Sequence, residues 1–440
     1  MKTNSILYQM FLRPFIPDGT LKGAEKMLPH IASLGFDIVY LCPVFDADDD
    51  TDLRFWSPKH MKSKLTLPKN SYRIRDYFKI DEEYGTEEDL HSFVKTAHEH
   101  GLKVLLDLVY FHCGPKAVFI ADHPNYVLCD ELGNVACGRW NFPQLNYESS
   151  ELREYLYGNM EYYIKEFDVD GYRCDVAEYV PLDFWAEGKK RILAINPKAI
   201  LVNEGDSIEY NEEIFDAYYN FKFGHNLRKA LRGEISAADF VAEASLHRSK
   251  MPKRSIPLNF LDNHDTVKDV LREFDRIEKI IGHDRMEAAI VLLYTVEGVP
   301  FMYNGNEICD TRKHTVYANR FNEPELRIDW SNACTPEAKR RMRIMRELAA
   351  FHSNNKILVN GSMEWLMVSD SENVVAFRRD FEGRSILVVI NISGKTVEAN
   401  VDFVTKVNAK VLMQKGLVIT ERGEKLCFVA ERGGYLVIEQ

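Results

Sequence analysis

The sequence predicts an α/β fold in which a closed (β/α)8 barrel carries a C-terminal antiparallel β-sandwich. From the start of the chain to about residue 355, short apolar runs alternate with helical stretches, and repeated strand–helix units indicate a parallel sheet. About eight such units over this length favour a closed barrel over an open sheet. After residue 356 the sequence changes to short strand-like runs separated by turn residues, which is typical of an antiparallel module.

The predicted barrel strands are apolar without alternation, as expected of strands that are covered on both faces. Residues 37–41 (DIVYL) and 103–109 (KVLLDLV) show this pattern most clearly. In chain order, the predicted strands are residues 6–11, 37–41, 103–109, 169–175, 199–204, 217–223, 256–261 and 300–303.

Helical stretches separate these strands. The stretch 86–100 has the clearest ends, because Thr86 is a good N-cap residue, Asp89 lies in the first turn and Gly101 terminates the helix. The other predicted helices are residues 19–34, 151–167, 184–195, 286–296 and 337–352.

Two long stretches interrupt the alternation, residues 46–70 and residues 113–147. Loops of this length inside a compact domain are usually functional, and these two follow predicted strands, on the face where barrel enzymes carry their active sites. We therefore divide the chain into a catalytic barrel, a short domain inserted after the third strand, and a C-terminal β-sandwich. The boundaries are residues 1–112 and 148–355 for the barrel, 113–147 for the inserted domain and 356–440 for the β-sandwich.

The composition limits which partners the protein can bind. The formal net charge is −11, with no basic stripe, which argues against nucleic acid as a ligand. No stretch approaches the roughly 20 apolar residues of a membrane span, and the N-terminus lacks the pattern of a signal peptide. The eight cysteines are scattered, which suits a reducing compartment. We expect a cytoplasmic protein, or a secreted one if a leader has been removed; the oligomeric state is not predicted.

Polar side chains stand at the carboxyl ends of successive predicted strands: Asp107, His112, Arg173, Asp175, Glu204, His264 and Asp265. Converging carboxylates either hold a divalent metal ion or divide the roles of nucleophile and general acid in glycoside cleavage. Arg173 precedes Asp175 by two residues in a strand, so both side chains point to the same face. A neighbouring arginine favours the ionised form of a carboxyl group, which makes Asp175 the candidate nucleophile and leaves Glu204 as the acid.

Four of these segments, in this order, resemble the sequence regions of glycoside hydrolase family 13, the α-amylase family: residues 107–112 (DLVYFH), 171–175 (GYRCD), 203–204 (NE) and 260–265 (FLDNHD). Residues 8–9 (YQ) and 298–307 (GVPFMYNGNE) add to the resemblance, which covers essentially the whole chain. The DVA stretch at 175–177, together with Asn146, is most similar to the neopullulanase and oligo-1,6-glucosidase side of the family.

The resemblance implies a role for each catalytic position. Asp175 matches the nucleophile, Glu204 the general acid/base, and Asp265 the third acid, which binds sugar hydroxyls. Arg173 matches the arginine that orients the nucleophile, and Asp107 an acid that is mainly structural. Retaining cleavage then predicts that the carboxyl groups of Asp175 and Glu204 lie about 5–5.5 Å apart.

The resemblance also implies substrate-binding positions. His112 and His264 match the histidines that bind sugar hydroxyls at the cleavage site, and Tyr72 matches the tyrosine that stacks under the sugar ring.

No metal or other cofactor is expected. Phe111 stands where family members with a structural calcium ion often have Asn, and Asn146 stands where they have Asp. The acidic run at residues 46–50 starts like an EF-hand loop but lacks the glycine and the glutamate that such a loop needs. We expect this run to be a solvated loop.

These observations predict a retaining α-glucoside hydrolase that acts on α-glucans or malto-oligosaccharides. A transglycosylase or phosphorylase of the same family, which shares the covalent intermediate, is an alternative. So are a non-catalytic carbohydrate-binding or scaffold member and a metal-dependent barrel hydrolase. The linkage cleaved and the choice between endo and exo action stay open at this point.

Overall fold

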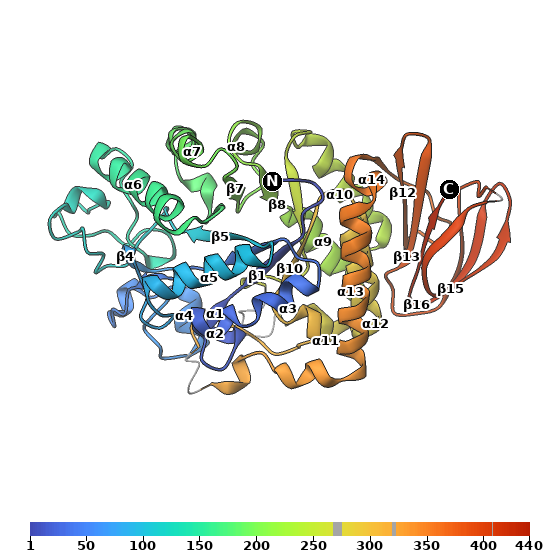
Figure 1. The fold of residues 1–440 in the computed structure, drawn as a ribbon, viewed down its shortest axis with the longest axis horizontal. Helices are drawn as coiled ribbons and strands as arrows, with labels where there is room; N and C mark the ends of the chain where they lie inside the picture. Colours follow the sequence, from blue (N-terminus) through green and yellow to red (C-terminus); the bar gives the residue numbers. More distant parts are fainter. Residues whose placement is uncertain (267–274, 319–322, 407) are drawn as a thin grey trace.

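The computed structural model describes residues 1–266, 275–318, 323–406 and 408–440. Eight parallel strands of the described chain close into a barrel in the order β1-β10-β9-β8-β7-β6-β5-β2 (Figure 1). They are β1 (Leu7–Met10), β2 (Ile38–Leu41), β5 (Lys103–Leu108), β6 (Gly171–Cys174), β7 (Ile200–Asn203), β8 (Ala217–Tyr219), β9 (Ile256–Asn259) and β10 (Val299–Tyr303). The predicted closed barrel is confirmed.

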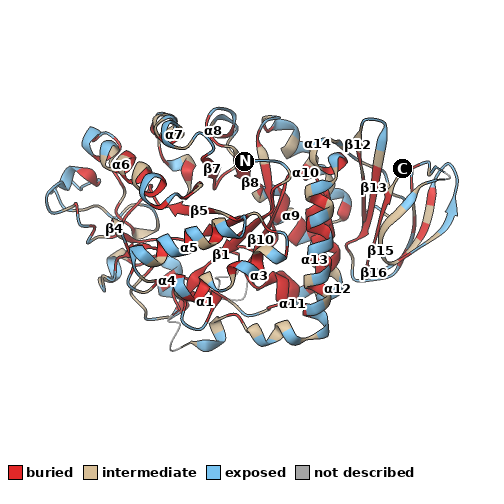
Figure 2. Ribbon diagram, viewed as in Figure 1, coloured by how far each residue is buried: buried red, intermediate tan, exposed pale blue. Residues whose placement is uncertain are grey.

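The barrel strands are buried on both faces. Every residue of β1, β2, β6, β7 and β10 is buried, and Figure 2 shows the strands as the buried centre of the molecule. This burial explains why their sequences do not alternate between apolar and polar residues.

One predicted strand, residues 217–223, is too long. β8 ends at Tyr219, and helix α9 (Phe221–Arg232) begins two residues later. Phe223, Leu227 and Leu231 are buried in α9, and their spacing of four residues belongs to a helix rather than to a strand.

Helices surround the barrel. Helix α5 (Glu87–Glu99) has the predicted N-cap, since Thr86 accepts from the backbone N–H of Asp89 and the Asp89 side chain accepts from that of Thr86. The other helices of the described chain are α1 (Leu12–Phe15), α2 (Leu21–Glu25), α3 (Leu28–Ser33), α4 (Pro58–Ser63), α6 (Ser150–Phe167), α7 (Leu182–Ile195), α8 (Ile208–Glu213), α10 (Ala237–Lys250), α11 (Ile277–Ile281), α12 (His283–Thr295), α13 (Pro336–Asn354) and α14 (Lys356–Asn360). None of the described helices is long and apolar enough to cross a lipid bilayer.

The acidic run at residues 46–50 is not the solvated loop that we predicted. Strand β3 (Phe45–Ala47) pairs with β4 (Ile74–Ile80) in a two-stranded antiparallel sheet outside the barrel. Asp48 is buried against Arg73, with 3.0 Å between Oδ1 and Nη2, and Asp46 pairs with Arg75. The sequence prediction failed because the two arginines that neutralise these acids lie 25 and 29 residues further along the chain.

The C-terminal part is antiparallel, as predicted. Its strands are β11 (Ser362–Trp365), β12 (Val374–Phe381), β13 (Arg384–Asn391), β14 (Val397–Val401), β15 (Lys410–Arg422) and β16 (Leu426–Glu439). Side chains such as Phe377 and Val388 join the barrel core, whereas their neighbours Ala376 and Leu387 belong to a second apolar core with β14 and β15. The sheet lies beside α12 and α13, at the end of the molecule away from α6 and α7 (Figure 1).

A buried carboxyl group couples barrel stability to pH. The hydroxyl of Tyr8 on β1 donates to Oε1 of Glu307 at 2.7 Å, while Oε2 is buried and has no hydrogen-bond partner among the described residues. Burial raises the pKa of Glu307 to about 7, so the folded state binds this proton more tightly than the unfolded chain does. The protonated form stabilises the fold below the unfolded pKa, near 4.5, and this stabilisation is lost as the pH rises to about 7.

Replacing Glu307 by Gln, which imitates the protonated acid, should therefore reduce the loss of stability between pH 5 and pH 8. We expect the difference in the free energy of unfolding between variant and wild type to change by about 2–3 kcal/mol over this interval. Urea unfolding at both pH values measures this difference. Glu131→Gln on an exposed loop is the matched control and should show no such change. If the free energy of unfolding changed with pH by the same amount in E307Q and wild type, the raised pKa of Glu307 would be contradicted.

Candidate active site

A pocket of about 530 Å³ opens at the carboxyl ends of the barrel strands. Six of the predicted site residues line it: Tyr72, His112, Asp175, Glu204, His264 and Asp265. Arg173 is 1% exposed and contacts two of the pocket acids, Asp175 and Glu204, and it also contacts the buried Asp107. Residues that lie up to 193 positions apart in the chain, from Tyr72 to Asp265, thus surround one space.

Arg173 is the shared partner of three carboxyl groups at the pocket. Its Nη1 donates to both oxygens of Asp107, at 2.7 and 2.9 Å, and to Oδ1 of Asp175 at 2.9 Å. Its Nη2 lies 2.5 Å from Oε1 of Glu204. The guanidinium also lies over the rings of Tyr40 and Tyr219, with 5.7 and 5.4 Å to the centroids, where the ring faces attract a cation. The predicted proximity of Arg173 and Asp175 is confirmed.

One guanidinium serves three buried carboxyl groups. Burial raises the pKa of Asp175 to about 6, even though Arg173 acts to lower it, and the nearby charge of Asp107 raises it further. The sequence points to Arg173 as the main influence on the pKa of Asp175, but the loss of solvation has the larger effect on this pKa. Burial also raises the pKa of Glu204 well above its usual value, again against the effect of Arg173. With a pKa of about 6, Asp175 is mostly ionised at pH 7, and burial favours the protonated form of Glu204.

Glu204 is held from its other side by a strained backbone. The N–H of Val176 donates to Oε2 of Glu204 at 2.9 Å, and Val176 has φ 37° and ψ 45°. A β-branched residue rarely adopts this left-handed conformation, and such strain is found mainly at functional sites. Val176 was not predicted, since nothing in a DVA tripeptide indicates a positive φ.

Tyr72 and His264 sit beside this cluster. The Tyr72 hydroxyl lies 2.9 Å from Oδ2 of Asp107 and 2.7 Å from Nε2 of His264. The ring of Tyr72 lines the pocket. Nε2 of His264 lies 3.6 Å from Oδ2 of Asp265, whose side chain is 34% exposed. Asp265 is thus the most exposed acid of the group, as expected for a side chain that meets substrate rather than the protein interior.

His112 is fixed by the backbone. Its Nε2 lies 2.9 Å from the carbonyl oxygen of Tyr72, and its own carbonyl accepts from the Tyr77 hydroxyl at 3.0 Å. Nδ1 is buried without a hydrogen-bond partner in the structure. Burial lowers the pKa of His112 to about 4, so the ring is neutral at pH 7.

Two aromatic residues that we did not predict, Trp140 and Tyr317, line the pocket, and other rings pack against them. On one side His60 stacks between Trp56 and Tyr317, at centroid distances of 4.0 and 4.5 Å, and the Tyr317 hydroxyl meets Ser57. On the other side Trp140 has φ 60° and packs edge-on against His112. Trp56, Ser57 and His60 come from the long stretch 46–70 and Trp140 from 113–147, whose length was the available signal, whereas Tyr317 follows β10.

The structural calcium ion that the family resemblance implies does not fit here. The Phe111 ring packs against Trp140 and Tyr179, with centroids 5.9 and 5.1 Å apart, where a metal ligand would be needed. The Asn146 amide nitrogen donates to the carbonyl of Asn125 at 3.0 Å. An apolar ring and an amide committed to the backbone do not form an oxygen cage for Ca²⁺.

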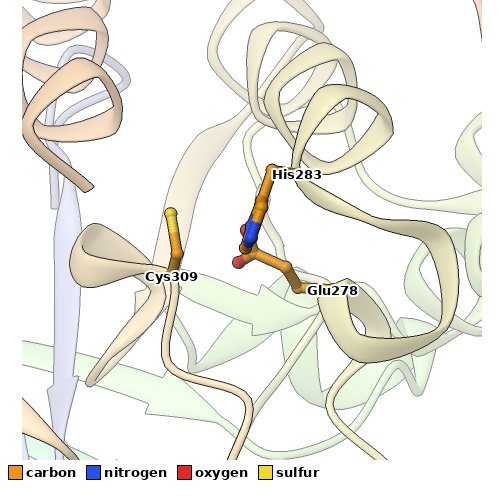
Figure 3. Close-up of side chains that lie close together, drawn as sticks. All are labelled: Glu278, His283 and Cys309. Carbon is orange, nitrogen blue, oxygen red and sulfur yellow. The ribbon is translucent and has the colours of Figure 1, made fainter. Parts of the chain in front are cut away.

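A second cluster of polar side chains lies outside the pocket. Glu278, His283 and Cys309 bring their polar atoms within 4.8 Å of one another (Figure 3). The Glu278 carboxylate is paired with Arg341, with 2.7 Å between Oε1 and Nη2, and with Nδ1 of His283 at 2.7 Å. Because a guanidinium already neutralises this carboxylate, the cluster is an ion-pair network at the start of α12 rather than a cation site.

Comparisons with known proteins agree with this architecture. The family model described as "Alpha amylase, catalytic domain" matches residues 4–126 and 136–373. A maltogenic alpha-amylase of Bacillus acidopullulyticus is 25% identical over 446 residues, covering 93% of this chain and 69% of the relative. Neopullulanase 2 of Thermoactinomyces vulgaris is 25% identical over 411 residues, covering 86% and 63%. The structure of a maltogenic alpha-amylase from Thermotoga neapolitana aligns with a TM-score of 0.83 and 26% identity, covering 100% and 99%.

Proposed function

The chain belongs to the alpha-amylase family of glycoside hydrolases, and on this premise we propose that its pocket cleaves malto-oligosaccharides with retention of anomeric configuration. The observation that carries the proposal is the pairing of Asp175 and Glu204 with one buried guanidinium. Retaining cleavage needs one ionised and one protonated carboxyl group on the two sides of the same bond. Burial raises the pKa of Glu204 well above its usual value and that of Asp175 to about 6, which supports this division.

Each residue then has a defined role. A carboxylate oxygen of Asp175 attacks the anomeric carbon while the bond to the leaving oxygen breaks and Glu204 gives that oxygen its proton. Glu204, now ionised, takes a proton from water, and the resulting hydroxide displaces Asp175. Arg173 keeps Asp175 in place, and the Val176 N–H orients Glu204.

The other polar residues bind the sugar. Asp265, His264 and His112 line the pocket, and Asp265, whose side chain is 34% exposed, offers an acceptor to sugar hydroxyls. Tyr72 offers an aromatic ring to the sugar face. Because Asp107 is fully buried under Arg173 and Tyr72, we assign it a structural role.

Relatives named maltogenic amylase, cyclomaltodextrinase and neopullulanase support short α-glucans as substrates. We also retain the division into a barrel (1–112 and 148–355), an inserted domain (113–147) and a C-terminal β-sandwich (356–440). A cytoplasmic location is supported by a relative named "Intracellular maltogenic amylase" and by free thiols at all eight cysteines.

Product analysis tests the proposal. Maltotriose, panose, pullulan and a cyclomaltodextrin are incubated with the enzyme, and the anomer released first is identified by ¹H NMR before mutarotation. We expect α-configured products from at least one substrate. Products of β configuration would overturn the retaining mechanism, and no cleavage of any substrate would overturn the proposed function.

The pH profile of the activity should be bell-shaped. The acid limb of kcat/KM should lie near pH 6, where Asp175 loses its proton, and the alkaline limb should follow the deprotonation of Glu204. Asp107→Asn removes a negative charge that raises the pKa of Asp175, so its acid limb should move to lower pH. An acid limb that stays in place or moves upward in D107N would contradict this electrostatic account.

A further inference from the structure

Gln9 on β1 contacts His264 twice, although the two residues are 255 positions apart in the chain. Its Nε2 lies 2.7 Å from Nδ1 of His264, and its Oε1 lies 3.3 Å from the backbone nitrogen of His264. Gln9 is fully buried on a barrel strand. The amide is therefore held against both the ring and the main chain of the same residue.

The backbone contact fixes which way the amide points. A backbone N–H can only donate, so the atom that faces the His264 nitrogen must be the acceptor Oε1. Nε2 then faces the ring and donates its two hydrogens to Nδ1 of His264 and to Sγ of Cys42, which lies 3.4 Å away. Nδ1 consequently carries a lone pair and no proton, which excludes both the Nδ1–H tautomer and the imidazolium ion.

The opposite side of the ring leads to the same tautomer. The Tyr72 hydroxyl has one proton, and it lies 2.9 Å from Oδ2 of Asp107. The Asp107 carboxylate also accepts from Arg173 and from the Tyr40 hydroxyl at 2.5 Å, which makes it the acceptor for Tyr72 as well. The contact of 2.7 Å between Nε2 of His264 and Tyr72 therefore needs the proton on Nε2.

We propose that Gln9 is a positioning residue that holds His264 in the neutral tautomer with its proton on Nε2. The Nε2–H then donates to the Tyr72 hydroxyl, and the ring is fixed with Nε2 3.6 Å from Oδ2 of Asp265. That the fixed ring helps to bind a sugar rests on the proposed function, whereas the tautomer itself does not.

The tautomer can be observed directly. In protein labelled with ¹⁵N-histidine, a long-range ¹H–¹⁵N spectrum at neutral pH distinguishes a pyrrole-like Nε2 from a pyridine-like Nδ1, and His264→Gln identifies the signals of this ring. We expect wild type to show protonated Nε2 and unprotonated Nδ1. Gln9→Met, similar in shape but without a donor, should mix the tautomers and lower kcat/KM about 10- to 100-fold.

Cys42→Ala is the matched control, because it removes the other partner of the Gln9 amide and should leave the His264 signals unchanged. Gln9→Glu, which offers an acceptor to Nδ1, should move the proton to Nδ1 and serves if Q9M does not fold. A proton on Nδ1 in wild type, or a Q9M spectrum identical to that of wild type, overturns the proposal. Since the spectra need no turnover, they remain informative even if the proposed substrates fail.

Discussion

Replacing Asp175 by Asn should lower kcat/KM on malto-oligosaccharides by on the order of 10⁵-fold, because an amide cannot form the covalent intermediate. The fold should survive the change. Burial raises the pKa of Asp175 to about 6, so the ionised form costs stability that Asn does not, and the variant should be at least as stable as wild type at pH 8. Activity is measured with maltotriose and stability by thermal unfolding.

The controls separate a nucleophile from a residue that merely shapes the pocket. Asp183→Asn makes the same change at a carboxylate that is 71% exposed and should leave activity unchanged. Glu204→Gln should lose activity on maltotriose but keep it on α-glucosyl fluoride, whose leaving group needs no proton. Asp175→Asn should be inactive on both substrates. Turnover of the fluoride by D175N would reassign the nucleophile.

Most of the barrel could be predicted because its determinants are local. Apolar runs such as residues 103–109 predict strands covered on both faces, and the polar residue that ends each run lies on the catalytic face. Asp107, Arg173 and Glu204 meet for this reason: Asp107 and Arg173 are register partners on neighbouring parallel strands, and Glu204 directly follows the end of the next strand. The topology alone converts their sequence positions into proximity.

The unpredicted features depend on distant partners or on backbone angles. Asp48 was predicted to be solvated because its partner Arg73 lies 25 residues further along the chain. Gln9 looked like one more strand residue because His264 is far away in the chain. The positive φ of Val176 is imposed by the site rather than by its own preference. The effect of burial on the pKa of Asp175 was not predicted for a related reason. A sequence shows the neighbouring arginine but does not show that water is excluded from the carboxyl group.

Replacing Arg173 by Met should destabilise the protein by about 3–5 kcal/mol at neutral pH, because it leaves buried carboxyl groups without their counter-charge. Arg173 is 1% exposed and contacts Asp107, Asp175 and Glu204. Without it the pKa values of these acids rise further above those of the unfolded chain. The stability of the variant is therefore lost as the pH rises, so its deficit should be largest near pH 8 and shrink toward pH 5. Urea unfolding at the two pH values measures the difference.

Two further variants show whether charge or packing causes this loss. Arg191→Met removes a partly exposed arginine paired with Glu154 and Glu187 and should cost less than about 1 kcal/mol, with little dependence on pH. Adding Asp107→Asn to R173M removes one of the stranded charges and should recover part of the stability at pH 8. If R173M lost the same stability at both pH values, and D107N recovered none of it, Arg173 would act through its packing between Tyr40 and Tyr219. The shared guanidinium would then not explain why Asp175 is ionised while Glu204 is protonated.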